Sequence, residues 1–106
     1  MKIEKPATKH QVLDMVVSTY IMQQGDFLGM HDHPEGMEHS TIVVKGSVMC
    51  EGEMGVQHLD DRPPYNVIYW PPNKDHNVIA GPLGAIVVNI SKEGGMYAHI
   101  TKHNPT

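Results

Sequence analysis

The feature that most constrains the fold of this chain is its series of short strand-like segments between turn signals. β-Branched and aromatic residues gather in windows of roughly four to eight positions, and Gly, Pro, Asn or Asp separates these windows about every eight to twelve residues. No window shows sustained helical periodicity. The pattern predicts some eight or nine short strands, and therefore an all-β sandwich or small barrel.

The predicted strands are bounded by Gly- and Pro-containing turns along the whole chain. They cover residues 11–23 (either one long strand or two short ones bent at Ser18), 27–33, 40–45, 47–50, 56–59, 66–70, 76–80, 83–90 and 96–101. Residues 1–10, which include Pro6, are expected to form an N-terminal arm. A chain of 106 residues is long enough for one core, so residues 11–106 are interpreted as a single domain.

The charge, the absence of long apolar runs and the cysteine content indicate which partners and which cell compartment to expect. The formal net charge is −4, which gives no reason to expect binding to nucleic acid or to an anionic membrane surface. No apolar run approaches the roughly 20 residues of a membrane span, and residues 1–10 do not resemble a signal peptide. Cys50 is the single cysteine, so an intramolecular disulfide is impossible and a reducing, cytoplasmic compartment is expected.

Three histidines, His31, His33 and His39, fall within nine positions directly before a Val-rich segment. His31 and His33 are two apart, so on an extended backbone both imidazoles project from the same face. The residues that follow His33 include Pro and Gly and predict a turn, after which His39 opens the next strand. Two neighbouring strands then direct three neutral nitrogen ligands toward one point, which is how a first-row transition metal is held.

A fourth histidine, His76, follows a strand that stops at Pro71 and a turn through Asn73. Asn tolerates the left-handed backbone conformation better than most residues, so Asn73 can take a place usually given to Gly. His76 then begins the following strand and is the fourth candidate metal ligand.

These two segments resemble the two motifs of the cupin family. The first motif has a Gly, five residues, His-x-His, a third ligand, six residues and a second Gly, which matches Gly25, His31, His33, His39 and Gly46. In the second motif the matching residues are Pro71, Asn73 and His76, whereas Tyr65 and Ala80 replace the usual Gly and Asn. The resemblance covers residues 25–80 and implies a jelly-roll β-barrel that holds a metal.

The third ligand departs from the family pattern, in which it is usually a glutamate. Counting forward from His33 selects Glu38, whereas counting back from Gly46 selects His39. Adjacent residues on a strand face opposite sides, so only one of the two can serve. We favour His39, because strand pairing fixes its distance from Gly46 while the preceding loop can absorb an extra residue. Glu38 is then the candidate catalytic carboxylate, or a solvated loop charge.

The ligand set implied by the resemblance is His31, His33, His39 and His76 around one divalent transition metal. Imidazole ligands suit Fe, Mn, Ni, Zn or Cu, and spacing does not distinguish these ions. Four neutral ligands leave the charge of the ion uncompensated, which attracts anionic oxygen ligands. On a six-coordinate ion two positions remain, for bidentate substrate binding or for one substrate atom beside dioxygen.

The walls of the expected pocket follow from strand alternation. The residues that share faces with the ligands are Phe27, Thr41, Val43, Val78 and Ala80. This set is mostly apolar, so the sequence predicts a small, dry cavity for a small organic molecule. Cys50 is interpreted as a buried small hydrophobe.

Three functions remain open because cupins resemble one another across several activities. The first is an oxygenase-type enzyme that brings a small oxygen-bearing substrate together with dioxygen. The second is a metal-dependent isomerase or lyase of a carbohydrate-like acid, with Glu38, His58 or Tyr65 as general base. The third is a non-catalytic small-molecule-binding module.

The small size of the domain also suggests self-association. The resemblance to small single-domain cupins implies a dimer, because such proteins usually exchange or pair their N-terminal strands. The apolar segment over residues 12–22 could serve this purpose, because an apolar sheet edge otherwise promotes aggregation. A homodimer is therefore expected.

Overall fold

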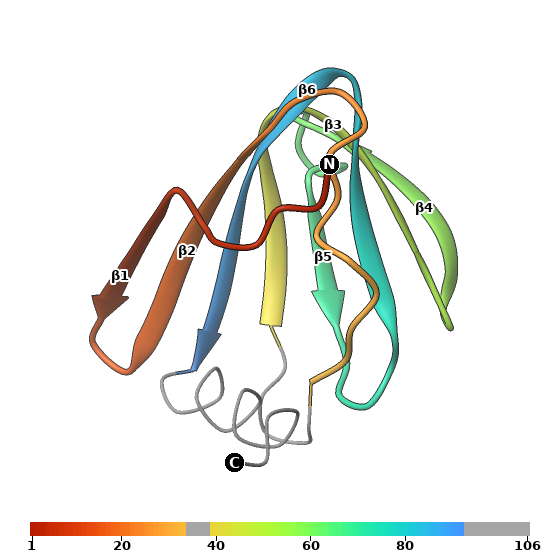
Figure 1. The fold of residues 1–106 in the computed structure, drawn as a ribbon. Helices are drawn as coiled ribbons and strands as arrows, with labels where there is room; N and C mark the ends of the chain where they lie inside the picture. Colours follow the sequence, from red (N-terminus) through yellow and green to blue (C-terminus); the bar gives the residue numbers. More distant parts are fainter. Residues whose placement is uncertain (34–38, 93–106) are drawn as a thin grey trace.

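The computed structural model describes residues 1–33 and 39–92, and every regular element within these ranges is a β-strand (Figure 1). The strands are β1 (Thr8–Val12), β2 (Met15–Met22), β3 (His39–Gly52), β4 (Gly55–Asp60), β5 (Val67–Trp70) and β6 (His76–Lys92). They pair antiparallel in the order β1-β2-β6-β3-β4, with β5 paired to β3 off this path. The all-β fold class predicted from the turn spacing is confirmed.

Two long strands, β3 and β6, bend so that each contributes to both sides, or walls, of the barrel. Figure 1 shows β6 arching over the top and descending on the other side. The first half of β3 pairs with β5 and with the end of β6, and its second half pairs with β4 and with the start of β6. The register shifts between Val43 and Lys45 and between Gly46 and Val48 are bulges, which bend the paired strands.

These bends explain one difference from the predicted strands. The segments over 40–45 and 47–50 were expected as separate strands, as were those over 76–80 and 83–90. In each pair the two segments join into one strand, β3 or β6, because glycine at the bend lets the backbone turn without leaving the sheet. The φ angle of Gly46 is +81°, and a Cβ there would overlap the carbonyl oxygen of Gly84.

The core lies between the two walls. Side chains alternate along β3 and β6, and the inward-facing ones are almost fully buried. They include Val43, Val48, Cys50, Val78 and Val87. The strands predicted over residues 47–50 and 56–59 are present and pair as a hairpin between the second half of β3 and β4, with Cys50 opposite Gln57.

The segment over 27–33 is not a continuous strand, in contrast to the prediction. It makes isolated bridges, in which Phe27 pairs with Ile79 and His31 pairs with His76. Positive φ at Gly29, +98°, interrupts the extended conformation between these bridges. The predicted strand over 96–101 lies outside the described residues.

The N-terminal residues are bound to the domain rather than extended away from it. The amide of Ile3 donates to the carbonyl oxygen of Phe27 at 2.8 Å, and the amide of Phe27 donates to Met1 O at 3.1 Å. Ile3 also packs against the core. The expected boundary after residue 10 falls inside β1 (Thr8–Val12), and Ile3 packs against the core of the domain.

Candidate metal centre

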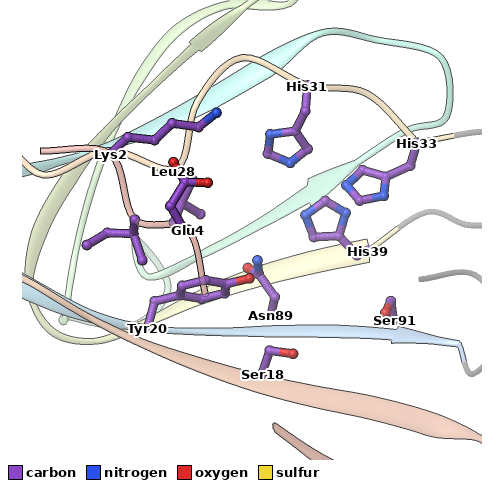
Figure 2. Close-up of a pocket in the computed structure, with 11 residues that line it drawn as sticks. Lys2, Glu4, Ser18, Tyr20, Leu28, His31, His33, His39, Asn89 and Ser91 are labelled. Carbon is purple, nitrogen blue, oxygen red and sulfur yellow. The ribbon is translucent and has the colours of Figure 1, made fainter. Parts of the chain in front are cut away.

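Four histidines from three separate segments converge on one site. His31 and His33 lie in the connection after β2, His39 begins β3, and His76 begins β6. One ligand nitrogen from each lies within 4.8 Å of the others. Figure 2 shows His31, His33 and His39 on one side of a shared cavity. The structure therefore brings together the four histidines that the motif spacing selects.

Backbone hydrogen bonds hold the two histidine-bearing segments side by side. His31 N donates to His76 O at 3.0 Å and His76 N donates to His31 O at 2.8 Å, so the two residues form a directly opposed antiparallel pair. Side chains of such a pair share one face of the sheet, and the two imidazole centroids are 4.4 Å apart. The amide of Asn73 donates to His33 O at 2.6 Å, and the φ of Asn73 is +60°, as its position in the turn predicts.

Two of the imidazoles have their tautomer set by the backbone. His31 Nδ1 lies 2.7 Å from Gly29 O, and His76 Nδ1 lies 3.0 Å from Lys74 O. A carbonyl oxygen only accepts, so Nδ1 carries the proton in both rings and Nε2 keeps its lone pair. Backbone carbonyls of this kind orient histidine ligands in metal sites.

Burial keeps His31 neutral. Desolvation lowers the pKa of His31 below its ordinary value, and the nearby charge of Lys2 acts in the same direction. The hydrogen bond to Gly29 and the carboxylates of Asp32 and Asp75 oppose this effect without cancelling it. A neutral imidazole is the form that binds a metal.

The side-chain alternation of β3 places His39 on the buried face. His39, Thr41 and Val43 are each at most 5% exposed, whereas Val44 on the other face is 56% exposed. This is the register that the choice of His39 as third ligand requires. Glu38 lies outside the described residues.

Trp70 supports the centre from behind. Its ring stacks on His76, with centroids 4.1 Å apart and planes 8° from parallel. Its Nε1–H donates to Thr41 Oγ1 at 2.9 Å, and the Thr41 hydroxyl donates to Asn89 Oδ1 at 2.6 Å. The stacking and these hydrogen bonds restrict rotation of the His76 ring.

The arrangement fits a transition metal by its own chemistry. All four donors are imidazoles, which are borderline ligands suited to first-row transition ions. His33 Nε2, His39 Nδ1 and His76 Nε2 are all buried from solvent. Four imidazole nitrogens within 4.8 Å of one another, two of them on rings oriented by backbone carbonyls, make a site that fits a single divalent ion.

The cavity next to the histidines has a volume of about 320 Å³, in the range of small-molecule sites. Its lining includes apolar Ile3 and Leu28, but most of the other residues are polar. The full lining is Lys2, Ile3, Glu4, Ser18, Tyr20, Leu28, His31, His33, His39, Asn89 and Ser91. Figure 2 shows Ser18, Tyr20 and Asn89 on the β2–β6 side, across from the histidines.

The residues predicted to line the pocket lie elsewhere. Thr41, Val43, Val78 and Ala80 are buried in the barrel, and Phe27 pairs with the N-terminal segment; none of the five belongs to the cavity lining among the described residues. The prediction assumed that residues on the face of a ligand also border its cavity. Val43, Val78 and Ala80 instead belong to the hydrophobic core, whereas the cavity is lined by residues of β2, the end of β6 and the N-terminal segment.

Three polar residues of the cavity were missed by the sequence reasoning. Ser18 in β2 and Asn89 and Ser91 in β6 interrupt otherwise apolar strands at inward-facing positions. A polar residue at such a position is the signal that could have identified them. Their meeting, however, depends on the β2–β6 pairing, which opposes Ser18 to Asn89.

Two candidate general bases do not reach the cavity. His58 in β4 and Tyr65 before β5 are both exposed, and neither lines the cavity among the described residues. Tyr20 and Glu4 line it instead. Burial raises the pKa of Tyr20 above its ordinary value, so its phenol is protonated at neutral pH.

Comparison with known proteins identifies the fold. No protein-family model and no curated protein matches the chain. Among solved structures, it is similar to a double-stranded β-helix protein from Klebsiella pneumoniae (21% identity, TM-score 0.70, covering 89% of this chain and 82% of that one). It is also similar to a cupin-2 domain protein from Shewanella frigidimarina, with 12% identity and a TM-score of 0.66 over 86% of this chain and 85% of that one. A third similar structure is an oxalate decarboxylase variant from B. subtilis, with 16% identity and a TM-score of 0.67 over 88% of this chain and 27% of that one. The chain has the cupin fold, as the two motifs imply.

The described ranges contain no helix with the length and apolar character needed to span a membrane.

Proposed function

We propose that this cupin-fold chain is a metal-dependent enzyme acting on a small oxygen-bearing organic molecule. The observation that carries the proposal is the convergence of four imidazole nitrogens within 4.8 Å beside a cavity of about 320 Å³. His31, His33, His39 and His76 would hold one divalent ion, either Fe, Mn, Ni, Zn or Cu. A bound ion supplies Lewis-acid chemistry and an attraction for anionic oxygen.

Oxygenase-type chemistry is the first candidate reaction. Four protein ligands leave room for a substrate that approaches from the cavity, and Ile3 and Leu28 shield part of that cavity from water. Oxygen consumption is the test, measured with iron- or manganese-loaded protein and candidate diketones, phenols or thiols. Substrate-dependent uptake would support the reaction, and its absence with every metal would contradict it.

Proton transfer on a carbohydrate-like acid is the second candidate, and the polar side chains among the cavity-lining residues favour it. Tyr20 offers a protonated phenol, and Glu4 offers a carboxylate at the rim. Isomerases and lyases need such a pair of donor and acceptor close to the substrate. Loss of substrate under strictly anaerobic conditions, followed by NMR in deuterated water, would separate this reaction from oxygenation.

A non-catalytic binding module is the third candidate. Such a protein would retain a small molecule without turning it over. Mass spectrometry of ligands released on denaturation, with assay of the same compound as substrate, decides between binding and catalysis.

A cytoplasmic location is part of the proposal, because a single buried cysteine is typical of reducing compartments.

A further inference from the structure

Ser18 is a buried polar residue in the wall of the cavity. It is 2% exposed, and no described group forms a hydrogen bond with its Oγ. It faces the same cavity as His33 and His39. Burying a hydroxyl without a partner destabilises a folded protein, so a purely structural role would be better served by Ala.

Asn89 lies directly opposite Ser18 in the β2–β6 pairing. The orientation of its amide follows from the hydrogen bonds behind it. Trp70 Nε1–H can only donate, so Thr41 Oγ1 accepts from it and donates its own proton onward to Asn89 Oδ1. Because Oδ1 is occupied in this way, the Nδ2 amide protons of Asn89 are the donors available to the cavity.

Two adjacent groups therefore present hydrogen-bonding capacity to a molecule in the cavity. Asn89 Nδ2 donates, and Ser18 Oγ both donates and accepts. A ligand with hydroxyl groups would satisfy both, whereas a hydrocarbon would leave them buried and unsatisfied. Ser91 is buried next to them on β6 and adds a further hydroxyl.

We propose that Ser18 and Asn89 form a hydroxyl-recognition subsite that selects a small polyhydroxylated carboxylic acid. This inference rests on the proposed function, in which a metal held by the four histidines attracts anionic oxygen, so the carboxylate end of the acid faces the histidine centre. Lys2 at the rim adds positive charge near His31, while Glu4 at the rim adds a negative charge. The hydroxyl-bearing end of the acid then lies along β2 and β6.

The first test measures the stability of metal-free protein by thermal unfolding. Ser18→Ala is expected to raise the unfolding midpoint by roughly 4 °C, because it removes a buried hydroxyl that lacks a protein partner. The matched control is Thr41→Val, which removes a hydroxyl whose two hydrogen bonds are satisfied and should lower the midpoint. A lower midpoint for Ser18→Ala would show that the hydroxyl supports the fold and would overturn the proposal.

The second test compares two acids that differ only in their distal hydroxyls. D-Gluconate and 2-hydroxyhexanoate have the same chain length and the same 2-hydroxycarboxylate end. Calorimetry with zinc-loaded protein is expected to show about tenfold tighter binding of gluconate. Ser18→Ala and Asn89→Leu should each weaken gluconate about tenfold and leave 2-hydroxyhexanoate unchanged.

Equal affinity for the two acids, or no binding of either, would overturn the subsite. Zinc content is measured first in every variant, so loss of the metal is distinguished from loss of the subsite. A wild-type protein that retains neither zinc nor iron, manganese, nickel or copper would contradict the proposed function. The subsite would then be judged by the unfolding midpoint of Ser18→Ala and by gluconate binding to the metal-free protein.

Discussion

Among the four histidines of the centre, His76 has its ring position fixed by the largest number of described contacts. It is 1% exposed, stacks on Trp70, and has its Nδ1 proton directed to Lys74 O. Replacing it removes a ligand whose orientation is already fixed, so little of the lost affinity can be recovered by rearrangement. His76→Ala should lower zinc affinity by at least roughly 100-fold in a competition titration with a chelator.

The control for this prediction is His58→Ala, which removes an exposed histidine of β4 and should leave zinc affinity unchanged. Retention of the β-sheet circular dichroism signal shows that each variant is folded. Equal zinc affinity in wild type and His76→Ala would exclude His76 from the ligand set.

Cys50 has a separate testable property. It is 2% exposed, and burial raises the pKa of its thiol to about 12. The reactive thiolate is therefore only about one part in 10,000 at pH 8. Folded protein should resist iodoacetamide at pH 8 and react fully in denaturant, as followed by mass spectrometry. Rapid alkylation of the folded protein would contradict the burial of Cys50.

At the scale of residues, the sequence was informative where the geometry is local. The His31–His33 spacing and the number of residues between His39 and Gly46 each depend on a few neighbouring positions. The structure brings the side chains of His31, His33 and His39 together. The cavity walls depend instead on pairing between distant strands. Ser18 and Asn89 meet only because β2 pairs with β6, and no local pattern specifies that register.

At the scale of elements, the close approach of β3 and β6 at their bends can be tested by replacing a glycine there with alanine. Gly46 and Gly25 have nearly equal φ angles, +81° and +78°, so alanine suffers the same backbone strain at both. At Gly46 a Cβ would also overlap Gly84 O, whereas nothing lies within 4 Å of a Cβ at Gly25. Gly46→Ala should lower the free energy of unfolding by about 3 kcal/mol and Gly25→Ala by about 1 kcal/mol.

Urea denaturation of the two variants measures this difference. Because the matched φ angles cancel the strain, the difference reports the close approach of β3 and β6 at the bend. Equal destabilisation of the two variants would mean that the strands do not approach closely there.

The strands themselves were largely predictable, but their continuity was not. Turn residues at Gly46 and at Gly81-Pro82 were interpreted as strand ends, since such residues usually end strands. Within β3 and β6 they instead bend strands that remain hydrogen-bonded on both sides. Distinguishing a bend from an end requires knowledge of the partner strand.

The outer surface of the sheet bears on the assembly of the whole molecule. Ile21 of β2, Val44 of β3 and Val67 and Tyr69 of β5 are each at least 50% exposed. Apolar residues gathered on one face of a sheet are typical of an interaction surface. The homodimer expected from the apolar 12–22 segment therefore remains a prediction, with this face added as a candidate contact.

Light scattering coupled to size-exclusion chromatography tests the assembly. Wild-type protein is expected to elute with the mass of a dimer, and Tyr69→Lys should shift it toward the monomer. Leu83→Lys, at the exposed bend of β6, is the control and should remain dimeric. A monomeric wild-type protein at micromolar concentration would contradict the prediction.

The direct measurement of the central claim is elemental analysis of protein purified without added metal, combined with anomalous scattering from its crystals. We expect close to one transition-metal ion per chain and one anomalous peak within bonding distance of imidazole nitrogens from His31, His33, His39 and His76. A folded protein that contains no such ion, takes up none from solution and shows its four imidazoles turned apart would contradict the claim.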